Sequence, residues 1–120
     1  MPPRQWRFRV NDMIDAIEAI ATYSEDLDED GFTHNRLVVD AVLRNLTVIG
    51  EAAASLPETI RMAAPKIPWT EIIGMRNVVV HGYFGVSLPM VWQTIQADLP
   101  QLHNHLAQLL REGPAADDAQ

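Results

Sequence analysis

The sequence predicts an all-α fold, an up-and-down bundle of four to five helices. Apolar residues recur every three or four positions over several segments, and no segment alternates polar and apolar residues for long. Prolines and glycines interrupt the chain at short intervals, and helices with short connections pack as antiparallel neighbours. With 120 residues, the chain can form one domain around one hydrophobic core.

The first two helices are predicted from their apolar periodicity, over residues 10–23 and 33–54. The acidic stretch 25–32 between them begins like a calcium-binding EF-hand loop. Leu37 occupies the position of the glutamate that closes such a loop, so a ligand that calcium needs is missing. We therefore expect a solvated linker there.

Proline and glycine mark the later helices. A short helix is expected to begin at Pro57 with Ser55 as its N-cap. A further helix is predicted over 68–81, because a proline begins it and Gly82 follows it as a C-terminal cap.

The last helix is predicted from Ser87 to about Arg111. Pro100 lies inside it, so we expect a kink or a break there, with Asp98 as a new cap. Residues 1–112 are expected to form the single domain, and residues 113–120 a disordered tail.

Composition restricts the function. The net charge of −7 argues against non-specific binding of duplex nucleic acid, which needs many phosphate contacts, but leaves room for a local site that handles one phosphate. The chain has no cysteine, which excludes disulfides and thiolate metal sites. No apolar run is long enough to cross a membrane and no signal core follows the N-terminus, so we expect a cytoplasmic protein. The arginines at positions 4, 7 and 9 are interpreted as a solvated arm.

The most apolar part of the chain contains an arginine and a histidine. On a helical wheel of about 100° per residue, Arg76 falls in the middle of an apolar arc. A buried arginine needs a carboxylate or a phosphate, because an unpaired buried charge costs several kcal/mol. Glu51 is the first candidate partner; with Arg44 it belongs to a polar line on the second helix, and both are predicted to support the site.

A stripe of small and polar residues follows the same helix: Thr70, Gly74, Asn77 and His81. Small residues there allow a second helix to approach closely, and the same helix of a second subunit would give a twofold interface. Arg76 and His81 lie roughly 140° apart, so they converge only if the arginine reaches back or if two subunits combine their copies. Catalysis and plain packing both remain open from this geometry.

With these residues identified, the chain resembles HEPN-domain proteins of the HepT type over about residues 10–110. The resembling stretches are "AVLRNLTVIGEAA", "IPWTEIIGMRNVVVHGYFGV" and "VWQTIQADLPQL". The family signature is an arginine and a polar residue, with a histidine four to six residues after the arginine. Arg76, Asn77 and His81 match it, and Tyr83 matches the tyrosine that HepT-like members carry two positions later. Many relatives have an acidic residue where this chain has Gly82.

The resemblance implies a dimeric HEPN bundle with two motifs facing each other across the subunit boundary. It implies a metal-independent ribonuclease, without a cofactor, that acts as the toxin of a toxin–antitoxin pair. Arg76 and His81 would be catalytic, Asn77 would support them, and Tyr83 would receive AMP from an antitoxin of the minimal nucleotidyltransferase (MNT) type.

The chemistry of these residue types fits that activity. RNA supplies its own nucleophile, the 2′-hydroxyl; histidine exchanges protons near neutrality, and arginine binds phosphate through a permanently charged fork. Two alternatives remain from the sequence. In the first, the chain is a non-catalytic helical subunit that binds substrate for a nucleotidyltransferase. In the second, it is a dimeric scaffold without any effect on nucleic acid.

Overall fold

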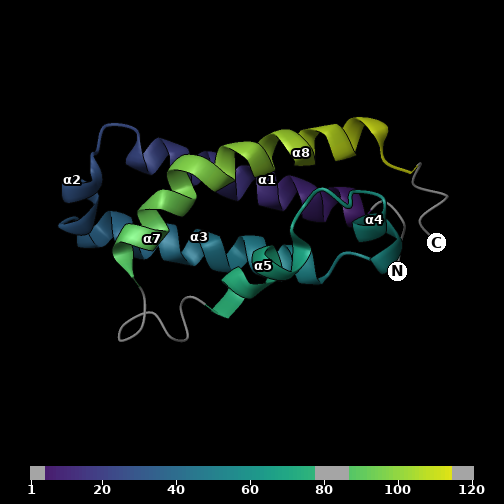
Figure 1. Ribbon diagram of the computed structural model, residues 1–120, viewed down its shortest axis with the longest axis horizontal. Coiled ribbons are helices and arrows are strands. Elements are labelled where there is room, and N and C mark those ends of the chain that lie inside the picture. The colour runs from purple at the N-terminus through teal and green to yellow at the C-terminus, as the bar shows by residue number, and fades with distance from the viewer. Residues whose placement is uncertain (1–4, 78–86, 115–120) are drawn as a thin grey trace.

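The computed structural model describes residues 5–77 and 87–114, and within them every regular element is a helix. The predicted all-α class is therefore confirmed (Figure 1). The elements in chain order are α1 Gln5–Ser24, α2 Glu29–Thr33, α3 Arg36–Ala54, α4 Glu58–Met62, α5 Trp69–Gly74, the 3₁₀ turn η1 Met75–Asn77, α7 Leu88–Gln93, the π-helical segment η2 Thr94–Asp98 and α8 Leu99–Glu112. Predictions that concern residues 1–4, 78–86 or 115–120 lie outside the described residues.

Three long helical rods form the frame of the molecule. α3 and α8 each run antiparallel to α1, while α5 and η1 pack on α3 (Figure 1). The core consists of apolar side chains at helical spacing on the inner faces of these rods: Val10, Met13, Ile17 and Ile20 of α1, Val39, Val42, Leu46 and Ile49 of α3, and Leu99, Leu102, Leu106 and Leu109 of α8. Each large side chain buried in this way contributes about 1.5–3 kcal/mol to folding. The apolar periodicity that predicted the first two long helices is thus confirmed as their buried face.

α1 begins five residues earlier than its periodicity predicted, because its first turn is attached to the end of α8. Arg7 donates hydrogen bonds to the carbonyl oxygens of Leu110, at 2.7 Å, and Pro114, at 3.1 Å. Its guanidinium also lies 4.4 Å from the ring centre of Trp6, which is buried. Arg7 therefore has a structural role, and its interpretation as part of a solvated arm is wrong.

The acidic stretch after α1 contains a short helix, α2, that the linker interpretation missed. Asp28 caps it by accepting a hydrogen bond from the Gly31 amide at 2.7 Å. Phe32 is fully buried and stacks at a tilt on Trp92 of α7, with 5.4 Å between ring centres. One cap and one buried aromatic ring are enough to order five residues, although five residues show no periodicity.

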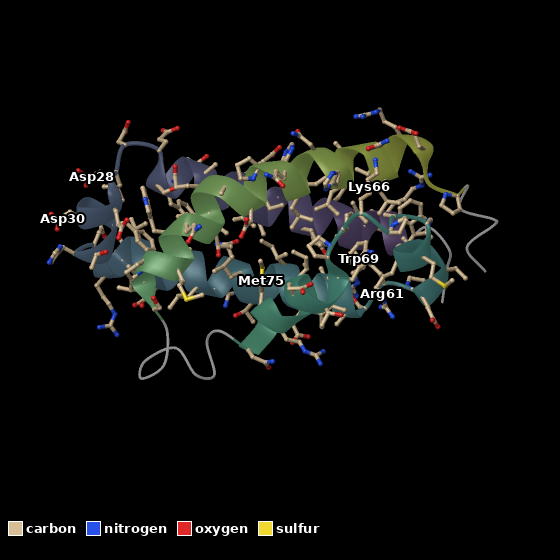
Figure 2. All side chains as sticks on the ribbon, viewed as in Figure 1. Asp28, Asp30, Arg61, Lys66, Trp69 and Met75 are labelled. Carbon is tan, nitrogen blue, oxygen red and sulfur yellow. The ribbon has the colours of Figure 1, made fainter. Side chains whose placement is uncertain are left out.

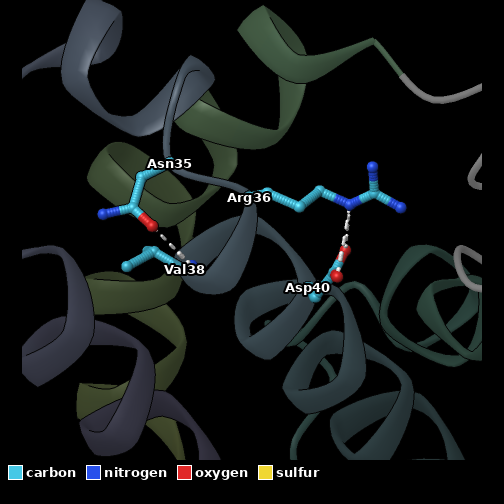
Figure 3. A network of polar contacts seen from close by, with 4 residues as sticks. All are labelled: Asn35, Arg36, Val38 and Asp40. Carbon is cyan, nitrogen blue, oxygen red and sulfur yellow. Dashed lines mark hydrogen bonds and ion pairs between the residues drawn. The ribbon is translucent and has the colours of Figure 1, made fainter.

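α3 begins at Arg36, three residues later than predicted, because Asn35 caps it. The side chain of Asn35 accepts a hydrogen bond from the Val38 amide at 3.1 Å. Arg36, the first residue of α3, pairs with Asp40 one turn further along the exposed face, at 3.1 Å (Figure 3).

Ser55 ends α3 instead of capping the next helix. Its hydroxyl donates to the carbonyl oxygen of Ala52 at 2.9 Å, so the predicted N-cap role is wrong. Pro57 takes the N-cap position of α4, without a side-chain hydrogen bond. The indole N–H of Trp69 donates to the carbonyl oxygens of Arg61, at 2.9 Å, and Ala64, at 3.0 Å. These bonds attach the start of α5 to the end of α4 (Figure 2).

The last rod begins and bends where proline and serine predicted. Ser87 caps α7 by accepting from the Met90 amide at 3.4 Å. The π-helical segment η2 directly precedes Leu99 and Pro100, as expected where a proline lacks the N–H of a regular helix. Asp98 makes no side-chain capping bond, so that part of the prediction is wrong. Within residues 5–77 and 87–114, no helix combines the length and apolar character that a membrane span requires.

Candidate functional site

Arg76 lies in the turn that ends α5. α5 is regular from Trp69 to Gly74, and the chain then tightens into the 3₁₀ turn Met75–Asn77. Ile72 is buried, and Met75, labelled in Figure 2, is half-buried against the core. These two apolar side chains hold the segment on the bundle. Arg76 and Asn77 are both exposed in the single chain. The turn thus presents two polar side chains from a fixed base.

The backbone of this turn rests directly on α3 at Gly50. A Cβ atom added to Gly50 would stand 2.3 Å from the backbone nitrogen of Arg76 and 3.0 Å from its Cα. Side chains do not approach a backbone nitrogen so closely, so glycine at position 50 is what allows the two segments to touch.

Sequence reasoning missed the contact at Gly50. A signal was present, since this glycine lies inside the long helix α3, where glycine costs about 1 kcal/mol relative to alanine. Such a residue indicates a close approach but does not reveal the approaching segment, which is 26 positions further along the chain.

The prediction of a buried Arg76 paired with Glu51 is wrong for the single chain. Both residues are exposed, and no ion pair or side-chain hydrogen bond links Arg76 to another described residue. The helical wheel assumed a regular α-helix up to residue 81, whereas the chain changes to a 3₁₀ turn at Met75. The turn brings the backbone of Arg76 against α3 and leaves its guanidinium without a partner among the described side chains.

The polar line on α3 consists of Asp40, Arg44, Thr47 and Glu51, and among the described contacts only the side chains of the first and third have partners on the same helix. Asp40 is paired with Arg36, and the hydroxyl of Thr47 donates to the carbonyl oxygen of Leu43 at 3.1 Å. Arg44 and Glu51 are exposed and make no ion pair with any other described side chain. Glu51 lines a shallow hollow of about 340 Å³ between α1 and α3, together with Arg9, Asp12, Thr47, Val48, Ala52 and Ser55.

The structure therefore describes only part of the predicted constellation. Arg76 and Asn77 are adjacent and exposed, whereas no ion pair between described residues joins Arg44 or Glu51 to either of them. His81, Gly82 and Tyr83 lie outside the described residues. The stripe predicted to meet a second subunit is exposed at Thr70, Gly74 and Asn77, and a Cβ atom at Gly74 would meet no atom of the described residues within 4 Å, apart from its chain neighbours and the backbone of its own helix. These three residues are therefore not covered by other described parts of the chain.

Comparisons with known proteins give this arrangement a context. Residues 13–109 match the family model described as "Ribonuclease HepT-like", and this span contains every residue of the candidate site. No solved structure shows a significant match to the chain.

Curated relatives carry ribonuclease names. A "Putative RNase" of Methanocaldococcus jannaschii is 33% identical over 112 residues, which cover 93% of this chain and 97% of the relative. A "Probable ribonuclease HepT" of Thermococcus cleftensis is 33% identical over 100 residues, or 83% of this chain and 91% of the relative. A third relative, a "Gamma-glutamylcyclotransferase and putative RNase" of M. jannaschii, is 35% identical over 103 residues. That match covers 86% of this chain but only 46% of the longer relative.

Proposed function

The chain belongs to the ribonuclease HepT-like family, and from this premise we propose that it is a metal-independent RNA endonuclease that works as a homodimer. Arg76 and His81 are its catalytic residues, and Asn77 orients them or the phosphate. Arg44 and Glu51 belong to the helix on which the site is built. The cytoplasm is where such an enzyme meets its RNA.

The observation that supports this proposal most is the state of Arg76. Its guanidinium is exposed and joined to no other described side chain, although its backbone is held against α3. An arginine used only for architecture would be expected to hold a carboxylate or a carbonyl oxygen, as Arg7 does at the other end of the molecule. An unpaired fork on a fixed turn suits a phosphate, which it binds through two parallel N–H groups.

The proposed reaction uses groups that RNA and two subunits supply. The 2′-oxygen forms a bond to the neighbouring phosphorus while the bond from phosphorus to the 5′-oxygen breaks. One copy of His81 takes the proton of the 2′-hydroxyl, and His81 of the partner subunit gives a proton to the departing oxygen. Arg76 stabilises the extra negative charge that develops on the phosphate in the transition state. Two copies of one histidine thus act as base and acid.

The biological role that we propose is that of a toxin in a toxin–antitoxin pair. The antitoxin is a nucleotidyltransferase of the MNT type, which transfers AMP from ATP to the hydroxyl of Tyr83 and releases pyrophosphate. The bound AMP adds a phosphate charge and a purine two residues from His81. Both the charge and the bulk exclude RNA from the site.

Expression without a partner tests the proposed activity. The wild-type chain should arrest growth and cleave RNA, and His81→Ala should lower cleavage by roughly 10²–10⁴-fold, the usual contribution of a general acid or base. His34→Ala is a matched control, because His34 is exposed and its described side-chain contacts, to the carbonyl oxygen and the carboxylate of Asp30, stay within one turn. RNA integrity, growth and circular dichroism are measured for each variant, and cleavage is repeated with a chelator.

Two results would contradict the proposal. Cleavage that disappears in the chelator would contradict metal independence. A folded wild-type chain that leaves growth and RNA unaffected would instead favour the non-catalytic subunit of a nucleotidyltransferase, for which the negative net charge of −7 offers some support.

A further inference from the structure

We infer that Gly50 is a positioning residue of the ribonuclease site: by allowing the backbone of Arg76 to touch α3, it sets where the guanidinium meets the phosphate. This inference rests on the proposed function. It assigns a positioning role to Gly50, a residue of α3 that has no polar side chain.

The contact leaves no room for a side chain at position 50. The added Cβ atom would lie 2.3 Å from the backbone nitrogen of Arg76 and 3.0 Å from both its Cα and its Cβ. All three contacts are to atoms at or next to the backbone, so rotating a flexible side chain cannot relieve them. A normal contact requires the two segments to separate by roughly 1 Å, a misplacement that can lower catalysis by about 10²-fold.

The 3₁₀ turn, and not α3, is the segment that would move. α3 is a 19-residue helix whose neighbouring residues Ile49 and Ala53 are completely buried. The turn has three residues, of which only Met75 packs on the core. Alanine also has a higher helix propensity than glycine, so the substitution strengthens α3 as it displaces the turn. Arg76 and Asn77 would shift together.

Position 50 differs in this respect from Gly74, the other glycine near the site among the described residues. A Cβ atom at Gly74 would meet no atom of another described segment within 4 Å, although Gly74 is only two residues from Arg76. Close approach is therefore specific to the contact with α3 and is not a general property of this segment.

Steady-state cleavage of a labelled RNA oligonucleotide tests the inference through a double-mutant cycle. Gly50→Ala should lower kcat by about 10²-fold and change KM by less than roughly threefold, because the displaced guanidinium is needed mainly in the transition state. Arg76→Ala should lower kcat by at least as much. The double variant should stay within roughly twofold of Arg76→Ala, since a positioning residue has nothing to position once the arginine is gone.

Val42→Ala is the control for a general loss of stability. Val42 is fully buried on the same helix, eight residues or about 12 Å from Gly50. Circular dichroism and thermal unfolding give the folded fraction of each variant, and kcat per folded molecule should be unchanged in Val42→Ala. If Gly50→Ala folds poorly, Met75→Ala replaces it in the cycle, because it loosens the same turn without an added clash.

The outcomes separate the two proposals. A wild-type chain that cleaves no RNA removes the proposed function, and this inference with it. A cleaving wild type together with a folded Gly50→Ala variant of normal kcat overturns this inference alone. So does a double variant whose loss is the full product of the two single losses, because Gly50 would then act independently of Arg76.

Discussion

Tyrosine differs from phenylalanine only in its hydroxyl group, so Tyr83→Phe removes the proposed AMP acceptor and little else. This substitution therefore tests whether AMP transfer to Tyr83 controls the ribonuclease activity. Tyr83→Phe should keep the ribonuclease activity of the wild type within a few-fold, because the proposed reaction uses His81 and Arg76. It should not accept AMP, since the acceptor oxygen is missing. With an MNT-type nucleotidyltransferase and ATP, wild-type cleavage should stop while the variant continues to cleave.

Mass spectrometry of the intact chain completes that test. The wild type should gain the mass of one or more adenylyl groups, and Tyr83→Phe should gain none. Tyr23→Phe is the matched control, because Tyr23 is an exposed tyrosine on α1 and should leave the modification unchanged. A Tyr83→Phe variant that is still modified and silenced would place the acceptor elsewhere.

Arg76 shows what single residues reveal before the structure is known. The spacing of Arg76, His81 and Tyr83, together with the resembling stretches around it, suggested the family, and the match over residues 13–109 confirms that resemblance. The environment of Arg76 was predicted wrongly, because periodicity treats the segment as an ideal helix of 3.6 residues per turn. The 3₁₀ turn at Met75 and the contact at Gly50 arise from packing between distant segments, which no local pattern encodes.

At the scale of elements, the attachment of α1 to α8 depends strongly on Arg7. Its guanidinium donates to two carbonyl oxygens and lies against Trp6. Arg7→Ala should destabilise the protein by about 2 kcal/mol, because hydrogen bonds from a charged donor contribute about 1.5–3 kcal/mol. Urea unfolding followed by circular dichroism gives the change in the free energy of unfolding.

Arg9→Ala is the control two residues away. Arg9 pairs with Asp12 at 3.7 Å, with both side chains about half exposed, and such surface pairs contribute at most about 1 kcal/mol. Equal losses for the two variants would show that Arg7 does not join the helices. A folded Arg7→Ala variant that loses RNA affinity at unchanged stability would instead assign this residue to RNA binding.

The long helices were predictable from their periodicity, and the short helix α4 from the proline that begins it, whereas α2 was missed. The apolar seams of α1 and α3 extend over several turns, so their spacing fixed both the helix and its buried face. α2 has five residues and is ordered by two contacts. Asp28 caps it through the Gly31 amide, and Phe32 packs on Trp92 of the distant helix α7. Ser55 could cap either of two helices by sequence, and only the hydrogen bond to Ala52 decides between them.

For the whole molecule, net charge and the proposed dimer together determine how RNA could bind. A chain with a net charge of −7 repels RNA at a distance, so an effective site has to concentrate its positive charge locally. Each subunit presents one unpaired Arg76 in the described part of its surface next to the exposed stripe of Thr70, Gly74 and Asn77. A twofold contact along that stripe would bring two guanidinium groups together. The sequence of one chain indicates such a dimer only through its small residues, which is why assembly stays a prediction.

Mixing subunits tests whether the proposed site is shared. A heterodimer of wild type and His81→Ala has one imidazole where the reaction needs two, so it should be nearly inactive. With a ninefold excess of His81→Ala and free exchange, about one wild-type subunit in ten keeps a wild-type partner, and activity per wild-type subunit should fall about tenfold. The measurement is RNA cleavage at a fixed wild-type concentration after the subunits have exchanged. The control excess is His81→Ala combined with Gly74→Leu, whose added side chain should prevent close approach along the stripe and so leave wild-type activity unchanged. Undiminished activity with the His81→Ala excess, in a sample shown by mass to contain heterodimers, would mean that each subunit carries a complete site.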